Sequence, residues 1–275
     1  MLLNAQSSLR LCSAFLWHAS NSICHEPVIF LVGGPRCGTT LLKQVLGSFP
    51  EICSVEQEST CLFLLRPRSW HRRYLSAEPG GLDERQWETP DDPVAVFSRI
   101  AAGRRQATDS AFFLDKLNTV FLHRPGFYVR HFPNAKFLVI SRDARDAVAS
   151  AATHVYLKTH SIERMAVIWN RFFTFAQQLQ QIQPAYSVSY EQLTRNPEET
   201  VASIAGFLGV PFDAEILRPD RYRPDTRMSS TEGFWRLRDP ISPVSVGRYK
   251  DRLSKSQIEL VESTCATGMR QLGYV

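Results

Sequence analysis

The chain has 275 residues, 44% of them hydrophobic and 21% charged, and its formal net charge at pH 7 is +5. This length suits one large α/β domain, or at most two small ones, with enough apolar side chains for a substantial core. The mild positive charge favours anionic ligands, the lack of Lys/Arg runs and zinc-finger spacings argues against nucleic acid, and no apolar run approaches the ~20 residues that span a bilayer.

The N-terminal segment and the cysteines bear on location. The apolar stretch after Arg10 is short and is followed by polar residues, which argues against a signal peptide. We expect residues 1–27 to form an N-terminal arm, in which the apolar stretch is a short helix or an ordered extended segment. The six cysteines are scattered and form no CxxC pair, which favours a reducing compartment over a disulfide framework. A cytoplasmic protein is therefore expected.

The first strongly patterned stretch reads as a strand, a glycine-rich turn and the start of a helix. Val28–Val32 is a continuous apolar run, typical of a central parallel strand, and apolar residues follow at helical spacing from Thr39. Gly33 and Gly38 are spaced as in the phosphate-binding motif G-x-x-x-x-G-K-[ST]. Thr39, however, stands where that motif has its lysine.

Strand and helix patterns then alternate to the end of the chain. Further strands are predicted at 111–116, 136–141 and 186–190. Helices are predicted at 59–65, from Asp91 or Asp92 to about 105, between the strands 111–116 and 136–141, from about 143 past 150, and at 162–181, 197–208 and 254–274. The alternation predicts a single α/β domain with a central parallel sheet flanked by helices.

The glycine-rich turn is a candidate phosphate site, because backbone N–H groups and a helix N-terminus converge there. A loop that hydrolyses nucleoside triphosphates adds a lysine for the β- and γ-phosphates. Here Arg36 and the hydroxyls of Thr39 and Thr40 replace it, which suits a ligand with fewer phosphates and no obligatory metal. The alternative is a strand–turn–helix corner whose glycines merely allow close packing.

A second basic element follows the strand 136–141. Arg142 lies at the carboxyl end of that strand, where ligands of open α/β sheets bind. Ser150 comes about two helical turns later and could present its hydroxyl to the same side. Asp143 or Asp146 could cap or charge the helix start, and Arg145 could be a surface ion-pair partner.

Together the two elements resemble sulfotransferases that use 3′-phosphoadenosine 5′-phosphosulfate (PAPS). The stretch GGPRCGTTLL resembles their 5′-phosphosulfate loop, and ISRDARDAVAS resembles their 3′-phosphate motif. The resemblance extends from about Val28 to the C-terminus, through SYEQL, NPEETVASIAGFLGVPF and SVGRYKDRLS, and is closest in layout to tyrosylprotein and small bacterial sulfotransferases. It implies a sulfotransferase domain over 28–275 and in-line sulfuryl transfer without a metal or a covalent enzyme intermediate.

The resemblance assigns residues to the 5′-phosphosulfate end of the site. Arg36 and Lys116 would place positive charge near the sulfuryl group and the bridging oxygen, where charge develops during transfer. The alternative for Lys116 is a solvated lysine at a strand end. The loop residues implied to bind the cofactor are Pro35, Arg36, Cys37, Gly38, Thr39 and Thr40.

The 3′-phosphate end is assigned in the same way. Arg142 and Ser150 would bind the 3′-phosphate, since an Arg fork and a hydroxyl fit an anion. Tyr190 matches a family position near the adenine, with a core tyrosine at a strand end as the alternative. A C-terminal loop would close over the 3′-phosphate; it contains Gly247, Arg248 and Lys250, and which of the two basic residues makes the contact stays open.

Two departures from the family pattern bear on this cofactor site. Cys37 replaces the usual serine, so one side-chain hydroxyl is lost while backbone contacts should survive. His154 lies where the tyrosylprotein branch has an arginine that helps to hold the 3′-phosphate. A neutral histidine would weaken that contact, and a protonated one could restore part of it.

The catalytic base is left between several residues. Sulfuryl transfer to a hydroxyl needs a group that takes the acceptor's proton. Strict counting against the tyrosylprotein branch lands on Gln57, and a shift of one residue gives Glu56, which is slightly favoured, or Glu58. Ordinary surface carboxylates are the alternative. Asn118 stands where cytosolic family members have a histidine, and His123 lies farther along.

The acceptor is not readable from the sequence. Residues 66–105 form the predicted acceptor-side insertion, with Trp70, Tyr74, Trp87 and Phe97 among many arginines. A small-molecule or natural-product acceptor is preferred, with a peptide tyrosine second. From other classes, a P-loop nucleotide kinase or ATPase, or a catalytically inactive nucleotide-binding protein, remains an alternative. Oligomeric state is not indicated.

Overall fold

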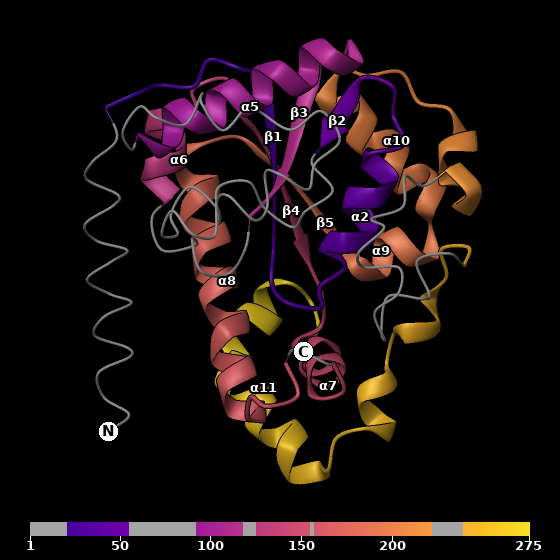
Figure 1. The fold of residues 1–275 in the computed structure, drawn as a ribbon. Helices are drawn as coiled ribbons and strands as arrows, with labels where there is room; N and C mark the ends of the chain where they lie inside the picture. The colour runs from indigo at the N-terminus through magenta and orange to yellow at the C-terminus, as the bar shows by residue number, and fades with distance from the viewer. Residues whose placement is uncertain (1–20, 55–91, 118–124, 155–156, 222–238) are drawn as a thin grey trace.

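The computed structural model describes residues 21–54, 92–117, 125–154, 157–221 and 239–275. Its centre is a five-stranded parallel sheet with strand order β2-β3-β1-β4-β5 (Figure 1). The strands are β1 (Val28–Gly33), β2 (Ile52–Ser54), β3 (Phe112–Lys116), β4 (Lys136–Ser141) and β5 (Ala185–Ser189). The predicted α/β fold with a central parallel sheet is thereby confirmed.

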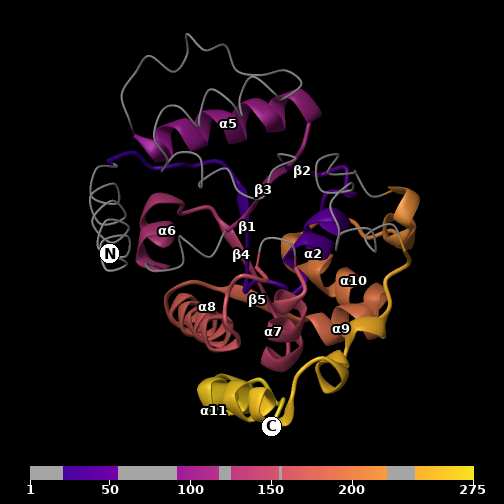
Figure 2. The same ribbon diagram turned by 60° about the horizontal axis from the view of Figure 1, so that its bottom comes forward.

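Helices cover both faces of this sheet (Figures 1 and 2). On one face pack α5 (Pro93–Thr108), α6 (Pro125–His131) and α8 (Ile162–Ile182). On the other face pack α2 (Thr39–Leu46), α9 (Tyr190–Arg195) and α10 (Pro197–Leu208). Two further α-helices of the described residues, α7 (Ala144–Ala152) and α11 (Lys255–Gln271), pack together with α8. Short 3-10 helices are η3 (Ala214–Leu217), η4 (Pro219–Arg221), η6 (Pro243–Ser245) and η7 (Arg248–Asp251).

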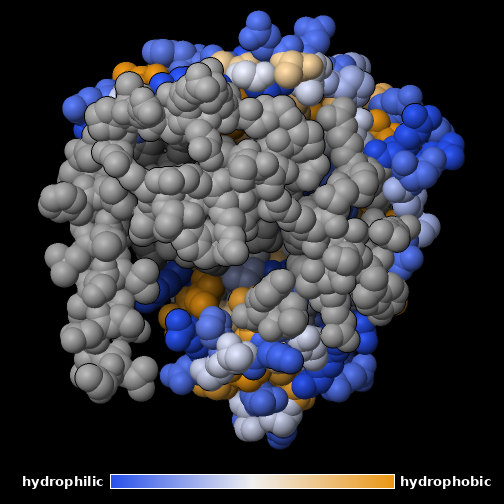
Figure 3. Space-filling view, viewed as in Figure 1, coloured by the Kyte–Doolittle hydropathy of each residue, from blue (hydrophilic) through white to orange (hydrophobic). Residues whose placement is uncertain are grey.

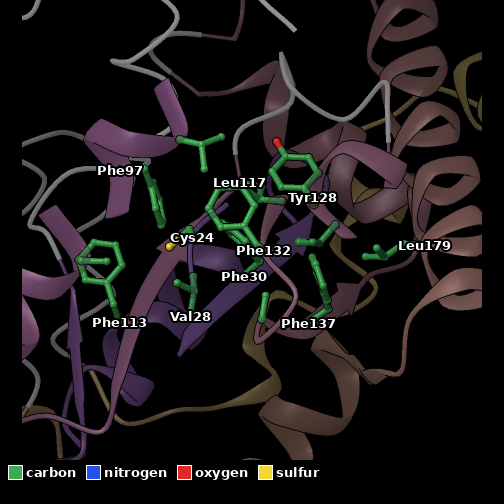
Figure 4. Close-up of a cluster of buried hydrophobic side chains, with 14 of the residues drawn as sticks. Cys24, Val28, Phe30, Phe97, Phe113, Leu117, Tyr128, Phe132, Phe137 and Leu179 are labelled. Atoms are coloured by element: carbon green, nitrogen blue, oxygen red, sulfur yellow. The ribbon is translucent and has the colours of Figure 1, made fainter. Parts of the chain in front are cut away.

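An aromatic cluster fills the space between the sheet and the helices α5, α6 and α8 (Figure 4). Phe30 of β1 lies at its centre, with ring centroids 5.8 Å from Phe97, 5.3 Å from Tyr128, 4.9 Å from Phe132 and 5.6 Å from Phe137. These rings are all buried, and edge-to-face pairs add to the free energy gained from burial. The cluster fixes β1 against the helices and so sets where the loop after β1 emerges.

Phe97 belongs to this core and not to a surface that could meet an acceptor. It lies in α5. The N-cap of this helix is Asp92, one of the two residues predicted to start it. The other aromatic residues of the predicted insertion, Trp70, Tyr74 and Trp87, lie outside the described residues, as do the predicted helix 59–65 and most of the N-terminal arm.

Among the described strands and α-helices, two were not predicted from the sequence. The edge strand β2 has three residues, too few to show a period. The helix α9 begins at Tyr190, which was expected to end a strand; the prediction was wrong because the strand β5 stops at Ser189. Ser189 caps the new helix, with Gln192 completing a capping box. Tyr190 is therefore the first residue of a helix at the carboxyl end of the sheet.

Within the described ranges, none of the helices combines the length and the apolar character needed to cross a bilayer. On the face seen in Figure 3, hydrophilic residues dominate the right-hand edge, and hydrophobic residues show in small areas. The cysteines in the described residues, Cys24, Cys37, Cys53 and Cys265, are buried free thiols.

Candidate functional site

The two basic elements meet at the carboxyl ends of β1 and β4. These strands are parallel neighbours, with Gly33 opposite Ile140, and β3 and β4 flank β1 on its two sides. The loop after β1 and the segment after β4 therefore leave the sheet side by side, at the position where open α/β sheets bind ligands. Figure 2 shows α7 at this end of the sheet, between α8 and α9.

The loop between β1 and α2 is tight enough to require its glycines. A Cβ on Gly33 would lie 2.6 Å from the Cγ2 atom of Thr39 and 2.8 Å from the backbone oxygen of Ile140. Gly38 has φ of 97°, and a Cβ there would lie 2.5 Å from the Cδ2 atom of Tyr190. A larger residue at either position would displace the loop, so its backbone path depends on glycine.

Cys37 buries its side chain in an apolar cluster. The thiol is 1% exposed and packs with apolar residues of α7, α8 and α11. Burial raises its pKa to about 12, so the thiol stays protonated near neutral pH. Its backbone N–H donates to the carbonyl of Gly34 at 3.1 Å, within the loop itself. The change from serine to cysteine thus places an apolar thiol in a packed, apolar environment.

Lys116 brings a cation to the loop from the neighbouring strand. It ends β3, is 8% exposed, and its Nζ atom donates to the Oγ1 atom of Thr40 at 3.1 Å. The alternative of a solvated strand-end lysine is therefore wrong. Lys116 thus brings a positive charge from a neighbouring strand to Thr40, the residue after the position of the motif lysine.

Arg142 lies at the opposite end of the crevice and is 5% exposed. Its Nη1 atom donates to the backbone oxygen of Arg36 at 3.0 Å, and its Nη2 atom donates to the backbone oxygen of Ser245 at 2.6 Å. The guanidinium carbon lies 4.2 Å from the ring centroid of Tyr190. The Nε atom is buried without a hydrogen-bond acceptor in the described part of the chain. A buried guanidinium with an unused donor suits an anion such as the 3′-phosphate.

Arg36 joins the two predicted elements directly. Its Nε atom donates to the Oγ atom of Ser150 at 3.1 Å, across 114 residues of sequence. Arg36 has φ of 63°, an uncommon backbone conformation for a residue with a side chain. The resemblance assigned Arg36 and Ser150 to opposite ends of the cofactor, and the structure shows them in contact. The basic groups therefore form one continuous site.

The start of α7 is held by an ion pair. Asp143, one of the two predicted candidates, is the N-cap and accepts from the backbone N–H of Arg145 at 2.8 Å. The Arg145 guanidinium lies 2.7 Å from Asp143 and 2.6 Å from Glu262 of α11. These carboxylates raise the pKa of Arg145. The predicted ion pair is present, but the Arg145 side chain is largely buried and so ties α7 to α11.

Glu191 and Tyr274 also contact the start of α7, and no role was predicted for either residue from the sequence. Glu191 of α9 accepts from the backbone N–H of Asp143 at 3.1 Å and from the Tyr274 hydroxyl at 2.8 Å. The backbone oxygen of Tyr274 accepts from Arg145 at 3.2 Å. Recognising the Ser189 capping box would have placed Glu191 in a helix beside the sheet, but no local pattern predicts a partner 83 residues away.

The other candidates lie in the loop, in the turns after α7 and at η7, or outside the described residues. Glu56, Gln57, Glu58, Asn118 and His123 fall outside the described residues, so the structure places no catalytic base. His154 is 7% exposed, buried in the turn after α7. Pro35 is partly buried in the loop. Gly247 and Arg248 are partly buried and Lys250 is exposed, in the turn at η7. No group of His, Cys, Asp and Glu suited to a metal occurs among the described residues.

Comparison with known proteins gives matches over most of the chain. A family model described as "Sulfotransferase family" matches residues 27–214. The zebrafish (Danio rerio) protein-tyrosine sulfotransferase 1 is 26% identical over 261 residues, which cover 90% of this chain and 72% of the relative.

Solved structures share the fold. The sulfotransferase domain of the Synechococcus PCC 7002 olefin synthase superposes with a TM-score of 0.63 at 18% identity, over 88% of this chain and 96% of that domain. A mouse sulfotransferase complexed with PAP (3′,5′-adenosine bisphosphate) superposes with a TM-score of 0.53 at 15% identity, over 91% of this chain and 87% of the mouse chain.

Proposed function

Since the chain belongs to the sulfotransferase family and is a PAPS-dependent sulfotransferase, we propose that it moves the sulfuryl group of PAPS to the phenolic hydroxyl of a peptide tyrosine. The sequence relatives that align over 90% of the chain include protein-tyrosine sulfotransferases. The net charge of +5 also favours an anionic peptide. A small-molecule acceptor, preferred from the sequence alone, is the second candidate.

The observation that carries this proposal is the convergence of basic groups on one crevice. Lys116 lies at the phosphosulfate loop, Arg142 at the end of β4, and Arg36 contacts Ser150 between them. Lys116 ends β3, Arg142 follows β4, Arg36 lies in the loop after β1 and Ser150 is on α7. The unused Nε donor of Arg142 fits an anionic group at the 3′-phosphate end.

Each residue has a role in this proposal. PAPS would supply a sulfuryl group already activated by its 5′-phosphate. Lys116 and Arg36 would stabilise the negative charge on the departing phosphate, and their partial burial strengthens that effect. Arg142 and Ser150 would hold the 3′-phosphate, with Arg142 kept in place by the carbonyls of Arg36 and Ser245. Glu56 or Glu58 would take the proton from the acceptor hydroxyl.

Radiolabelled sulfuryl transfer tests the proposal directly. The purified chain would be incubated with sulfur-labelled PAPS and an acidic peptide with one tyrosine, the same peptide with phenylalanine, or 4-nitrophenol. We expect label on the tyrosine peptide and none on the phenylalanine peptide. Labelling of 4-nitrophenol with no labelling of either peptide would favour the small-molecule acceptor.

A Lys116→Ala variant checks that the described crevice performs the transfer. Loss of one group that stabilises the charge of the transition state typically lowers kcat about 10²- to 10³-fold. Lys255→Ala, at the exposed start of α11, is the matched control and should retain full activity. Equal activity of the two variants would contradict the role of Lys116.

A further inference from the structure

We infer that Asp146 is a positioning residue for the 3′-phosphate end of the cofactor site, acting through the turn that carries Arg248. The inference rests on the proposed function, because it takes the 3′-phosphate to lie beside Arg142. Asp146 was expected only to cap or charge the start of α7. The cap is Asp143, so the carboxylate of Asp146 is available for another task.

The Asp146 carboxylate is buried and both of its oxygens bind the C-terminal turn. The side chain is 2% exposed. Its Oδ2 atom accepts from the backbone N–H of Gly247 at 2.6 Å, and its Oδ1 atom accepts from the backbone N–H of Tyr249 at 2.9 Å. A buried carboxylate is costly unless it is hydrogen-bonded, so these two contacts fix the side chain and the turn relative to each other.

Arg248 lies between the two anchored N–H groups. Gly247 has φ of 78° and precedes η7, so the chain turns sharply at that residue. The Asp146 carboxylate holds the backbone on both sides of Arg248, which is partly buried, whereas Lys250 is exposed at the outer side of the turn. The geometry therefore favours Arg248 over Lys250 as the basic residue directed at the 3′-phosphate.

The same turn is attached to the 3′-phosphate motif at two further points. Arg142 donates to the backbone oxygen of Ser245 at 2.6 Å, and the guanidinium carbon of Arg145 lies 4.5 Å from the ring centroid of Tyr249. Arg142, Arg145 and Asp146 thus all contact the segment 245–249. The motif that supplies Arg142 therefore also holds the turn that carries Arg248. Of its three residues that contact the turn, Asp146 is the one with a carboxylate.

The test compares PAP with adenosine 5′-monophosphate, which lacks the 3′-phosphate, by isothermal titration calorimetry. In Asp146→Asn an NH₂ group, which is a donor, replaces one of the two acceptor oxygens. One backbone N–H of the turn then loses its hydrogen bond. We expect the ratio of the two affinities to fall about tenfold, the scale of one lost charge-assisted hydrogen bond. Asp251→Asn makes the same charge change at an exposed position of η7 and should leave the ratio unchanged.

The outcomes separate this inference from the proposed function. A wild-type protein that does not prefer PAP would overturn both. A wild-type preference that Asp146→Asn leaves unchanged, because both affinities fall equally, would show a merely structural role and overturn the inference alone.

A double-mutant cycle tests whether Asp146 acts through Arg248. In an Arg248→Ala background, Asp146→Asn should no longer change the affinity ratio; in a Lys250→Ala background its full effect should persist. A full effect in the Arg248→Ala background would overturn the inference. If Asp146→Asn fails to fold, Gly247→Ala replaces it: a Cβ there meets no atom within 4 Å, so the strain is confined to the turn. It should lower the ratio in the same way, and an unchanged ratio would overturn the inference.

Discussion

Cys37 occupies a loop position where the family pattern has serine, yet its thiol packs in the cluster beneath the loop. Cys37→Ser should therefore leave the affinity for PAP within about twofold, while burial of a hydroxyl lowers the free energy of unfolding by about 1–2 kcal/mol. Calorimetry with PAP and urea denaturation measure the two effects. Cys265→Ser, in the same cluster but on α11, should show a similar loss of stability. Tighter PAP binding in Cys37→Ser would contradict this orientation.

Arg142 combines two backbone acceptors with a ring contact, which a lysine cannot reproduce. Arg142→Lys keeps the charge but should weaken PAP binding about 10- to 100-fold, since hydrogen bonds involving charged groups contribute about 1.5–3 kcal/mol. Calorimetry would measure the change. Arg195→Lys, at an exposed position of α9, is the control. Similar PAP affinities for the two variants would mean that charge alone suffices at position 142.

Among the secondary-structure elements, α8 and α11 pack unusually closely below the sheet. A Cβ on Gly268 of α11 would lie 2.7 Å from Trp169 and 2.9 Å from Phe173, both on α8. Gly268→Ala should therefore lower the free energy of unfolding by about 1–3 kcal/mol through overpacking. Gly206→Ala in α10 meets no atom within 4 Å and should raise it by up to about 1 kcal/mol, because alanine is the better helix former. Urea denaturation compares the pair.

The result for Gly268→Ala bears on the site as well. The Nε1 atom of Trp169 donates to the backbone oxygen of Arg142 at 3.0 Å. Displacement of the indole should therefore also weaken PAP binding, while Gly206→Ala should not affect it. Changes of stability with the same sign in both variants would contradict the close packing of α8 and α11.

Much of this arrangement could be predicted from local patterns. The central strands are long apolar runs, and Pro197 and Gly209 mark the two ends of α10. The short edge strand β2 had no detectable period, and α9 was hidden because Tyr190 continued an apparently alternating strand. The roles of Asp146 and Glu191 depend on backbone N–H groups that only the fold brings near them, so residue type and spacing alone could not reveal them.

On the scale of the whole molecule, Tyr274 links the C-terminal segment to the cofactor crevice. Its hydroxyl donates to Glu191, and Tyr274→Phe would leave that buried carboxylate without this donor. We expect a loss of about 1–3 kcal/mol in the free energy of unfolding at pH 7. Tyr186→Phe, beside Phe207, is the control with the same chemical change. Equal stability of Tyr274→Phe and the wild type would contradict the link.

The pH dependence gives a second readout of the same bond. Burial, with Glu191 nearby, raises the pKa of Tyr274 in the folded state. Because the pKa of this tyrosine is higher in the folded state, its protonated form stabilises the fold at pH values below the unfolded-state pKa of about 10. This contribution is lost as the pH rises above that pKa. The free energy of unfolding of the wild type relative to Tyr274→Phe should therefore be constant near neutral pH and should decrease above about pH 10. Urea denaturation over a pH series would measure it.

Ligand binding should stabilise the whole domain, since the cofactor crevice joins β1, β3, β4 and the C-terminal turn. PAP at about a hundred times its Kd should add about 2.7 kcal/mol to the free energy of unfolding. For a chain of this size that corresponds to a rise in Tm of about 5–10 °C.

This rise should be independent of magnesium, because PAP has no β- and γ-phosphates for the metal to bridge. Thr39 also occupies the position of the motif lysine that reaches those phosphates in a nucleoside triphosphate. Thermal denaturation with PAP, and with ATP in the presence and absence of magnesium, measures the preference. A shift that needs both ATP and magnesium would contradict PAPS as the cofactor and favour a nucleotide kinase. A shift with PAP that EDTA leaves unchanged would show that the cofactor binds without a metal, as expected if Lys116, which contacts Thr40 from β3, and the arginines of the site supply the positive charge.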